Sequence, residues 1–229
     1  MDANKVRHAL FNFSQSTSES LLKLFNGKKS SEELLQQLYI IKSIKIGLSY
    51  LNKENKSNFW DELFKGEVKH SSIYLSLENE NHEKTGVLVQ YGKYEFIQKE
   101  WIQKNLQPNI CNIGFPYGQR GGLMFGEINF SDFRDIFCSA GLIHPRIDPK
   151  KGVQMTLSNF FKRVKKIDKN PWDLDHYEAG SHSCQEFVAA ALKVIQVDYS
   201  SDQDKDDNLK EEDIPSAIRS ELEKHKKQE

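Results

Sequence analysis

The sequence predicts an α+β fold, in which β-rich runs in the middle of the chain lie between segments with helical periodicity. Two such runs, Ser72–Leu77 and Gly86–Tyr91, flank a short polar stretch and predict an antiparallel pair of strands. At 229 residues the chain is long enough for one substantial core. A helix near the C-terminal end is indicated by apolar residues at three- and four-residue spacing, namely Phe187, Val188, Ala191, Leu192 and Ile195.

We expect residues 1–66 to form a helical region that docks on the rest of the protein or binds a protein partner. Two capping-box patterns, Ser16-x-x-Glu19 and Ser30-x-x-Glu33, each predict the start of a helix. An apolar stripe on the second helix must be buried. This stripe consists of Leu34, Leu38, Ile41 and Leu48.

The main domain is expected over residues 67–197. After the predicted strand pair, Leu123–Ile128 predicts a further strand, and Ser131 begins a helix that includes Phe133 to Ala140 and ends at Gly141. The run Val153–Met155 predicts a short strand before a Thr156-capped helix that extends to Ile167.

Residues 198–229 are expected to form an acidic linker and a C-terminal helix. Asp198–Asp213 is acidic and nearly free of large apolar residues, which is typical of a linker. Ile214–Lys227 predicts a short helix with Pro215 in its first turn.

Composition narrows the candidate partners and the compartment. With 32 Lys and Arg residues against 33 Asp and Glu residues, the formal net charge is -1, which gives no bulk attraction to nucleic acid. The cysteines are Cys111, Cys138 and Cys184, an odd and sparse set that favours a reducing compartment. The N-terminus has no apolar signal region, and no apolar run is long enough for an integral membrane segment. We expect a cytoplasmic protein, or an exported effector without a signal peptide.

Cys184 is the leading candidate for a nucleophile because it lies at a predicted helix start. In Ser183-Cys184-Gln185-Glu186, the Ser183 hydroxyl is expected to accept from the third helical N–H, and Glu186 from the Ser183 N–H. Cys184 is then the first helical residue. The positive end of the helix dipole favours a thiolate there.

A thiol nucleophile also needs a base and a group that orients the base. His70, at the start of the first predicted strand, is the expected base, and Gln90, on the next strand, is the expected orienting group. His82, in the loop between them, is the alternative for that role. The competing interpretations are a structural cysteine in the core and a glutamine at a solvated sheet edge.

Three motifs occur in a characteristic order: His-Ser-Ser-Ile-Tyr-Leu-Ser from His70, Val-Leu-Val-Gln-Tyr-Gly around Gln90, and Ser-His-Ser-Cys-Gln-Glu-Phe-Val around Cys184. Together they resemble the circularly permuted branch of the NlpC/P60 papain-like superfamily, which includes the lecithin:retinol acyltransferase and H-rev107-like proteins. The resemblance covers Val68–Val197. In these families the residue before the cysteine is often Asn, where this chain has Ser183, and the third residue is often His, where it has Gln90.

The resemblance implies a papain-like core, with an antiparallel sheet packed on the Cys-bearing helix, and a thiol hydrolase or acyltransferase without a cofactor or metal. We expect cysteine-dependent acyl transfer on a peptide, protein or other acyl-bearing substrate. A peptide, isopeptide or amide bond is favoured over a lipid ester, because lipid-acting relatives commonly carry a hydrophobic membrane segment. The alternatives are a lipid acyltransferase or phospholipase of the same fold and a non-catalytic papain-like protein-binding module.

Other chemistries are less well supported by the sequence. A metal site would have to draw on the residues crowded before the helix, but no second ligand pair with zinc spacing occurs. Gly118–Gly122 lacks the Lys-Ser/Thr ending of a phosphate-binding loop and predicts a turn. Lys162–Lys166 is a basic cluster typical of a solvated helix face. The crowded residues are Asp173, Asp175, His176, His182 and Cys184.

Overall fold

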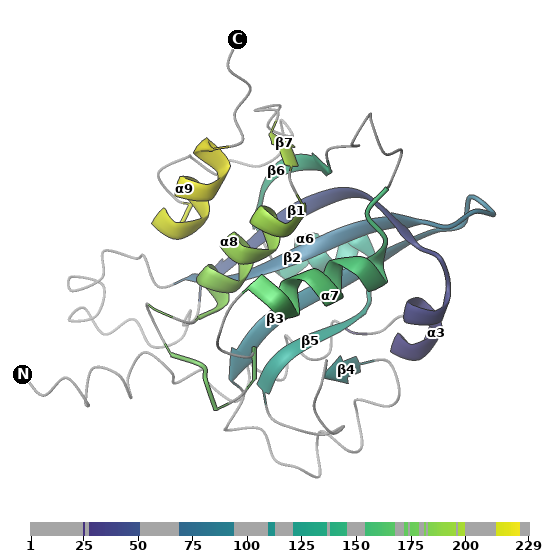
Figure 1. The fold of residues 1–229 in the computed structure, drawn as a ribbon, viewed down its shortest axis with the longest axis horizontal. Coiled ribbons are helices and arrows are strands. Elements are labelled where there is room, and N and C mark those ends of the chain that lie inside the picture. Colours follow the sequence, from purple (N-terminus) through teal and green to yellow (C-terminus); the bar gives the residue numbers. More distant parts are fainter. Residues whose placement is uncertain are drawn as a thin grey trace, which may run out of the picture.

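The predicted α+β class is confirmed by the computed structural model, in which helices pack on an antiparallel sheet (Figure 1). The structure describes residues 25, 28–50, 69–93, 110–112, 121–136, 138–145, 154–167, 172–173, 175–178, 181, 183–195, 197–199 and 214–224. In these ranges the sheet has seven strands, each antiparallel to its neighbours. Their order across the sheet is β4 (Ile110–Asn112), β5 (Gly121–Glu127), β3 (Lys84–Lys93), β2 (Lys69–Glu78), β1 (Ile40–Tyr50), β6 (Cys138–Pro145) and β7 (Val197–Tyr199).

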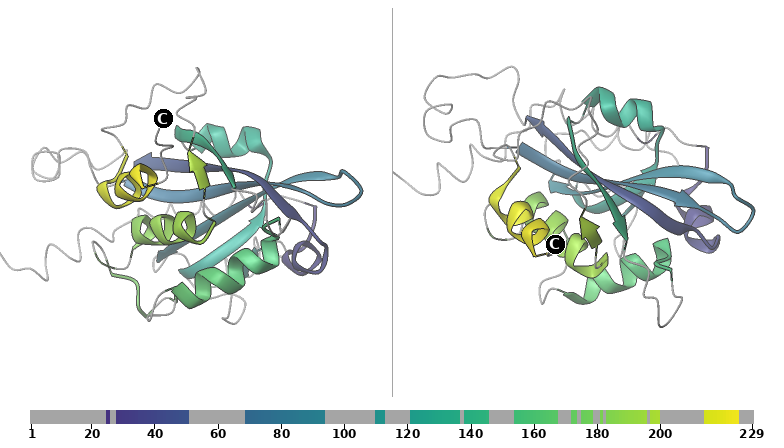
Figure 2. Two further views of the ribbon diagram at one scale, coloured as in Figure 1. Left: turned by 45° about the horizontal axis from the view of Figure 1, so that its top comes forward. Right: turned by 90° about the horizontal axis from the view of Figure 1, so that it is seen from above.

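Helices cover both faces of the sheet. Helices α7 (Leu157–Ile167) and α8 (Cys184–Ile195) lie across one face, and α6 (Phe130–Ile136) lies behind the other (Figures 1 and 2). Helix α9 (Ser216–Glu223) packs against α8. None of the helices in the described ranges is long and apolar enough to cross a membrane.

Side-chain alternation along β2 and β3 separates two buried layers. Tyr74 and Leu88 are opposite each other in register and face α6, where the Tyr74 ring lies 5.1 Å from the Phe130 ring and 5.2 Å from the Phe133 ring. The residues that alternate with them along each strand face α7 and α8 and form the main core with these helices. From β2 and β3 this core takes Ile73, Leu75, Leu77, Val87, Val89 and Tyr91, and from α8 it takes Phe187, Val188, Ala191, Leu192, Val194 and Ile195.

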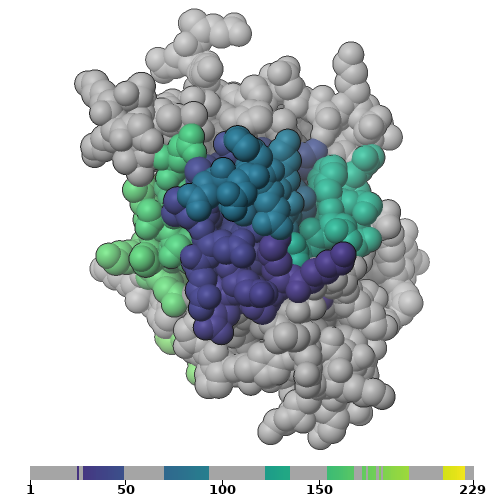
Figure 3. Space-filling view, turned by 90° about the vertical axis from the view of Figure 1, so that its right-hand side faces the viewer, coloured from purple at the N-terminus to yellow at the C-terminus, as the bar shows by residue number. Residues whose placement is uncertain are grey.

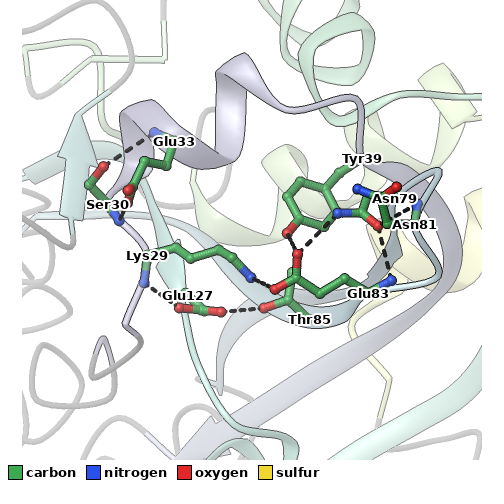
Figure 4. A network of polar contacts seen from close by, with 9 residues as sticks. All are labelled: Lys29, Ser30, Glu33, Tyr39, Asn79, Asn81, Glu83, Thr85 and Glu127. Carbon is green, nitrogen blue, oxygen red and sulfur yellow. Dashed lines mark hydrogen bonds and ion pairs between the residues drawn. The ribbon is translucent and has the colours of Figure 1, made fainter.

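The predicted strand pair is confirmed as the β2–β3 hairpin, and the predicted strand after it is confirmed as β5. The N-terminal segment lies against this hairpin (Figure 3), and a polar network joins the two (Figure 4). The Lys29 N–H donates to Glu127 Oε2 at 2.6 Å, and the Lys29 ammonium pairs with Glu83 in the hairpin turn. Burial alone would lower the pKa of Lys29, but hydrogen bonds to Glu83 and Tyr39 outweigh it and raise that pKa.

The expected helix beyond Gln36 is wrong. Helix α3 (Ser31–Gln36) starts with the predicted capping box, but Ile40–Tyr50 is strand β1, paired with β2 along its length. Leu38 of the expected stripe is 58% exposed. From residue 44 to residue 49 the apolar Ile44, Ile46 and Leu48 alternate with other residues at a period of two, and β-branched residues favour strands. The described part of the N-terminal region, residues 25 and 28–50, therefore contributes a short helix and a strand of the same sheet, and the first predicted helix, at Ser16, lies outside the described residues.

Two further boundaries differ from the predictions. The helix expected from Ser131 to Gly141 ends at Ile136, and Cys138–Pro145 is strand β6 instead. Pairing with β1 supplies this segment with the backbone hydrogen bonds that a helix would have provided. The strand expected at Val153–Met155 is absent from its described part, residues 154–155, and only Thr156 makes a bridge, to Ile40.

The remaining helix predictions hold with small shifts. Helix α7 follows Thr156, whose hydroxyl accepts from the Asn159 N–H at 3.2 Å. Helix α9 starts two residues after the predicted Ile214, so that Pro215 is its N-cap rather than part of its first turn, and it ends at Glu223 rather than Lys227. The predicted linker starts too early, because Val197–Tyr199 pairs with β6, and residues 200–213 lie outside the described ranges.

Replacement of Gly86 by alanine should destabilise the protein by about 1–3 kcal/mol, because the new methyl group would overlap the Tyr74 ring, whose Cε2 lies 2.6 Å from that position. Urea unfolding measures the loss. In a Tyr74→Ala background the same replacement should cost much less. An equal cost in both backgrounds would show that Tyr74 does not cause the strain.

Candidate active site

Helix α8 begins at Cys184, as predicted. Glu186 Oε2 accepts from the Ser183 N–H at 3.0 Å, which is the expected half of the capping box. The Ser183 hydroxyl accepts from the Gln185 N–H at 3.3 Å rather than from the third helical N–H, and it also contacts Glu186. The cap therefore fixes Cys184 in the first turn of the helix.

An aromatic cluster holds the segment that leads into α8. The Tyr91 hydroxyl donates to the Asp173 carbonyl at 2.8 Å. The Tyr91 ring lies 5.2 Å from the Trp172 ring, 5.0 Å from the Tyr177 ring and 6.2 Å from the Phe187 ring. These contacts connect β3, the segment before α8 and α8 itself, so the helix start is fixed relative to the sheet.

The Cys184 sulfur accepts a hydrogen bond from the Ser71 N–H at 3.5 Å. Pairing between β2 and β3 stops at Ser72 and Gln90, although β2 continues to Lys69 and β3 to Lys93 with their other neighbours. We call the gap beyond this last pair the β2–β3 fork. Backbone N–H groups of a strand point sideways toward its neighbours, and pairing with β1 is unbroken here. The sulfur therefore lies in the fork. It takes the position at which a β3 carbonyl oxygen would accept the hydrogen bond from the Ser71 N–H if the two strands stayed paired.

His70 and Gln90 are in contact on the sheet. Their Nε2 and Oε1 atoms are 3.2 Å apart, and both side chains are fully buried. An amide oxygen can only accept, so the imidazole carries its proton on Nε2 and its basic lone pair on Nδ1. The predicted orientation of Gln90 toward the ring is confirmed. His82 lies in the hairpin turn at the far end of β2, is largely exposed and bonds Glu78 at 2.8 Å, so it does not orient His70.

The fork brings Cys184 to the β2 backbone next to His70, and His70 contacts Gln90, but among the described residues the sulfur is bonded to this backbone and not to the imidazole ring. By alternation, His70 and Gln90 are on the face toward α6, whereas Cys184 comes from the helix on the opposite face. The Ser71 nitrogen is bonded to the His70 carbonyl carbon, so the sulfur is at most about 6 Å from His70 Cα. The sulfur is next to the backbone that carries the imidazole.

Burial dominates the protonation of the pair. It lowers the pKa of His70 to about 4, although the hydrogen bond to Gln90 acts in the opposite direction. It raises the pKa of Cys184, and the Glu186 charge raises it further, although hydrogen bonds from the Ser71 N–H and the Tyr177 hydroxyl oppose both effects. The expected thiolate is therefore wrong for the resting protein, which holds a neutral thiol and a neutral imidazole.

Two residues at the site were not predicted from the sequence, Ser71 and Tyr177. Both lie inside the quoted motifs, but nothing in their type or spacing distinguishes a donor to sulfur.

Asp173 Oδ1 accepts from the His176 backbone N–H at 2.9 Å and contacts His176 Nδ1 at 2.5 Å. His182 lies outside the described residues, and among the described ones no three metal-binding side chains are grouped.

No family model, no curated protein and no solved structure matches this chain. The site is thus defined by its own geometry: a capped cysteine at a helix start, in a strand fork, beside a histidine that is hydrogen-bonded to a glutamine.

The depressed pKa of His70 predicts a loss of stability in acid. Below about pH 6.5 the unfolded chain protonates this histidine, whereas the folded site stays neutral until about pH 4. Its contribution is therefore constant above pH 6.5 and falls by up to about 3 kcal/mol as the pH drops to 4. Urea unfolding of wild type and His70→Gln across this range should show a weaker acid loss in the variant. His82→Gln, at an exposed histidine, should behave as wild type. An unchanged slope in His70→Gln would show that His70 is not buried as a neutral ring.

Ser183→Ala should lower the free energy of unfolding by about 1 kcal/mol, because α8 loses its side-chain cap. Cys184→Ala should leave the fold intact. Urea unfolding and circular dichroism compare the two variants. If Cys184→Ala were as destabilising as a deletion in the core, the cysteine would have a structural role.

Proposed function

We propose that this protein is a cysteine-dependent acyl-transfer enzyme, a thiol hydrolase of a peptide, isopeptide or amide bond, with a papain-like core of the permuted NlpC/P60 type. The observation that carries the proposal is the hydrogen bond from the Ser71 N–H to the Cys184 sulfur. It joins a candidate nucleophile at a helix start to the strand that carries the candidate base. The contact between His70 and Gln90 adds the third group such a site needs.

In the proposed reaction, His70 Nδ1 takes the thiol proton from Cys184 as the sulfur attacks the substrate carbonyl carbon. Backbone N–H groups at the start of α8 are the candidate donors to the developing oxyanion. The imidazolium returns its proton to the leaving amine, and a thioester to Cys184 remains. Water, or another acceptor, then resolves the thioester with His70 as the base.

Because both groups start neutral, His70 acts as a general base at the moment of attack. Gln90 holds the tautomer that leaves Nδ1 basic. A neutral amide does this without the charge stabilisation that a carboxylate would give the imidazolium. We therefore assign Gln90 the role of a positioning residue, whose replacement lowers kcat/KM less than the replacement of His70 does. Lipid esters are the alternative substrate class for the same chemistry.

A second candidate, a non-catalytic papain-like binding module, is favoured by burial. Cys184 is only 4% exposed, and His70 and Gln90 are fully buried. Iodoacetamide labelling near neutral pH, followed by mass spectrometry, separates the two functions. In an enzyme with an accessible nucleophile, Cys184 reacts faster than Cys111 and Cys138. A Cys184 that reacts more slowly than both favours the binding module.

The variants at the three residues should differ in a fixed order when turnover of amide and ester acyl substrates is measured. Cys184→Ala should abolish turnover, and His70→Ala should reduce kcat/KM by about 100-fold to 10000-fold, the usual worth of a general base. Gln90→Ala should reduce it far less. Equal losses in His70→Ala and Gln90→Ala would place Gln90 at the substrate or the oxyanion. Full turnover by Cys184→Ala would remove the proposal.

The acidic limb of the kcat/KM profile should lie near pH 4 rather than near 6.5, because His70 is the base and its pKa is lowered to about 4 by burial. Initial rates from pH 3.5 to 8, each confirmed by circular dichroism to come from folded protein, give the profile. A limb near 6.5 would mean that the reacting form exposes the imidazole to water.

A further inference from the structure

Ser71, whose backbone N–H bonds the Cys184 sulfur, also has a hydroxyl group that bonds no described residue. Its side chain points to the face that packs on α8, because His70 and Ser72 alternate to the other face. Ser71 is fully buried, and its hydroxyl has no hydrogen-bond partner among the residues that the structure describes. Its own backbone N–H already donates to Cys184.

A buried hydroxyl without a partner destabilises a fold by about 1–3 kcal/mol, so such a group invites a functional explanation. A thiol is a weak acceptor, whereas a thiolate is a strong one that binds several donors. The Cys184 sulfur receives the Ser71 N–H and the Tyr177 hydroxyl in its resting state. A rotation about the Ser71 side-chain bond moves the hydroxyl between staggered positions without moving the strand.

We propose that Ser71 is a further catalytic residue, whose hydroxyl donates a hydrogen bond to the Cys184 sulfur once that sulfur has transferred its proton to His70. The Ser71 O–H bond stays intact, and no other reactant is needed. The titratable side chains that act on the sulfur are Tyr177 and Glu186, and the Glu186 charge opposes the thiolate. The Ser71 hydroxyl, as a third donor, offsets the unfavourable effect of the Glu186 charge on the thiolate. The role in turnover rests on the proposed function, whereas the contact with the thiolate does not.

The test compares Ser71→Ala with Ser72→Ala. Ser72 is a matched control: it is the next residue, is equally buried and also has a hydroxyl without a described partner, but it faces away from α8. The readout is the pKa of the Cys184 thiol, followed by the Cβ carbon-13 shift of labelled cysteine and assigned with Cys184→Ala. This readout does not depend on reagent access to the buried sulfur.

Ser71→Ala should raise the thiol pKa of Cys184 by about one unit, the lower range for a hydrogen bond to a charged group. Ser72→Ala should leave the thiol pKa at the wild-type value. Ser71→Ala should be no less stable than wild type to urea, because it removes an unsatisfied buried hydroxyl. An unchanged pKa in Ser71→Ala, an equal rise in both variants, or a wild-type thiol that stays protonated wherever the protein is folded would each overturn the proposal.

Trapping of the acyl-enzyme by mass spectrometry separates this proposal from the proposed function. An acyl group on Cys184 together with an unshifted pKa in Ser71→Ala would refute the role of Ser71 and leave the enzyme intact. A shifted pKa without any acyl-enzyme on a panel of amide and ester substrates would keep the contact and refute its role in turnover.

Discussion

The hydrogen bond from the Ser71 N–H to the Cys184 sulfur is the contact on which the arrangement of the site depends. A strand N–H left by the end of β2–β3 pairing would be buried and unsatisfied if nothing replaced the missing carbonyl. The sulfur replaces it, which fixes how deep the start of α8 inserts into the sheet. The cap at Ser183 and the aromatic cluster around Tyr91 then have to place the helix start within a narrow range. The end of β2–β3 pairing, the helix cap and the aromatic cluster therefore all determine the position of the Cys184 sulfur.

The same insertion explains why the helix start does not produce a resting thiolate. A helix dipole contributes roughly 1 kcal/mol at an exposed end and is easily exceeded by the desolvation of a charge. Cys184 is 4% exposed, and the capping carboxylate of Glu186 adds a like charge in the first turn. The capping box that defines the helix therefore works against ionisation of the cysteine. Ionisation of Cys184 therefore needs additional hydrogen-bond donors, and these are the Ser71 N–H of β2 and the Tyr177 hydroxyl.

The hairpin, the helix start and the contact between His70 and Gln90 could be predicted because each depends on local sequence. Alternation defines β2 and β3, a Ser-x-x-Glu box defines α8, and facing residues of adjacent strands share a side. Strands β1 and β6 could not be predicted in the same way. Leu34, Ile41 and Leu48 fit a helical stripe, and only pairing with distant β2 decides for a strand. The fork was equally hidden, because the point where two strands separate depends on which third strand each one pairs with.

Burial ties the chemistry of the site to the stability of the protein. A neutral His70 keeps Nδ1 unprotonated down to about pH 4, but the lowered pKa also makes it a weaker base than an exposed imidazole. Between about pH 6.5 and 4 the unfolded chain gains a proton at this residue. The free energy of unfolding, which is typically about 5–15 kcal/mol, therefore falls by up to about 3 kcal/mol. Exposure of the ring would remove this loss but would also admit water and return the base to an ordinary pKa. Burial at the fork therefore widens the pH range in which His70 Nδ1 is unprotonated. It also lowers the free energy of unfolding in the acidic part of that range.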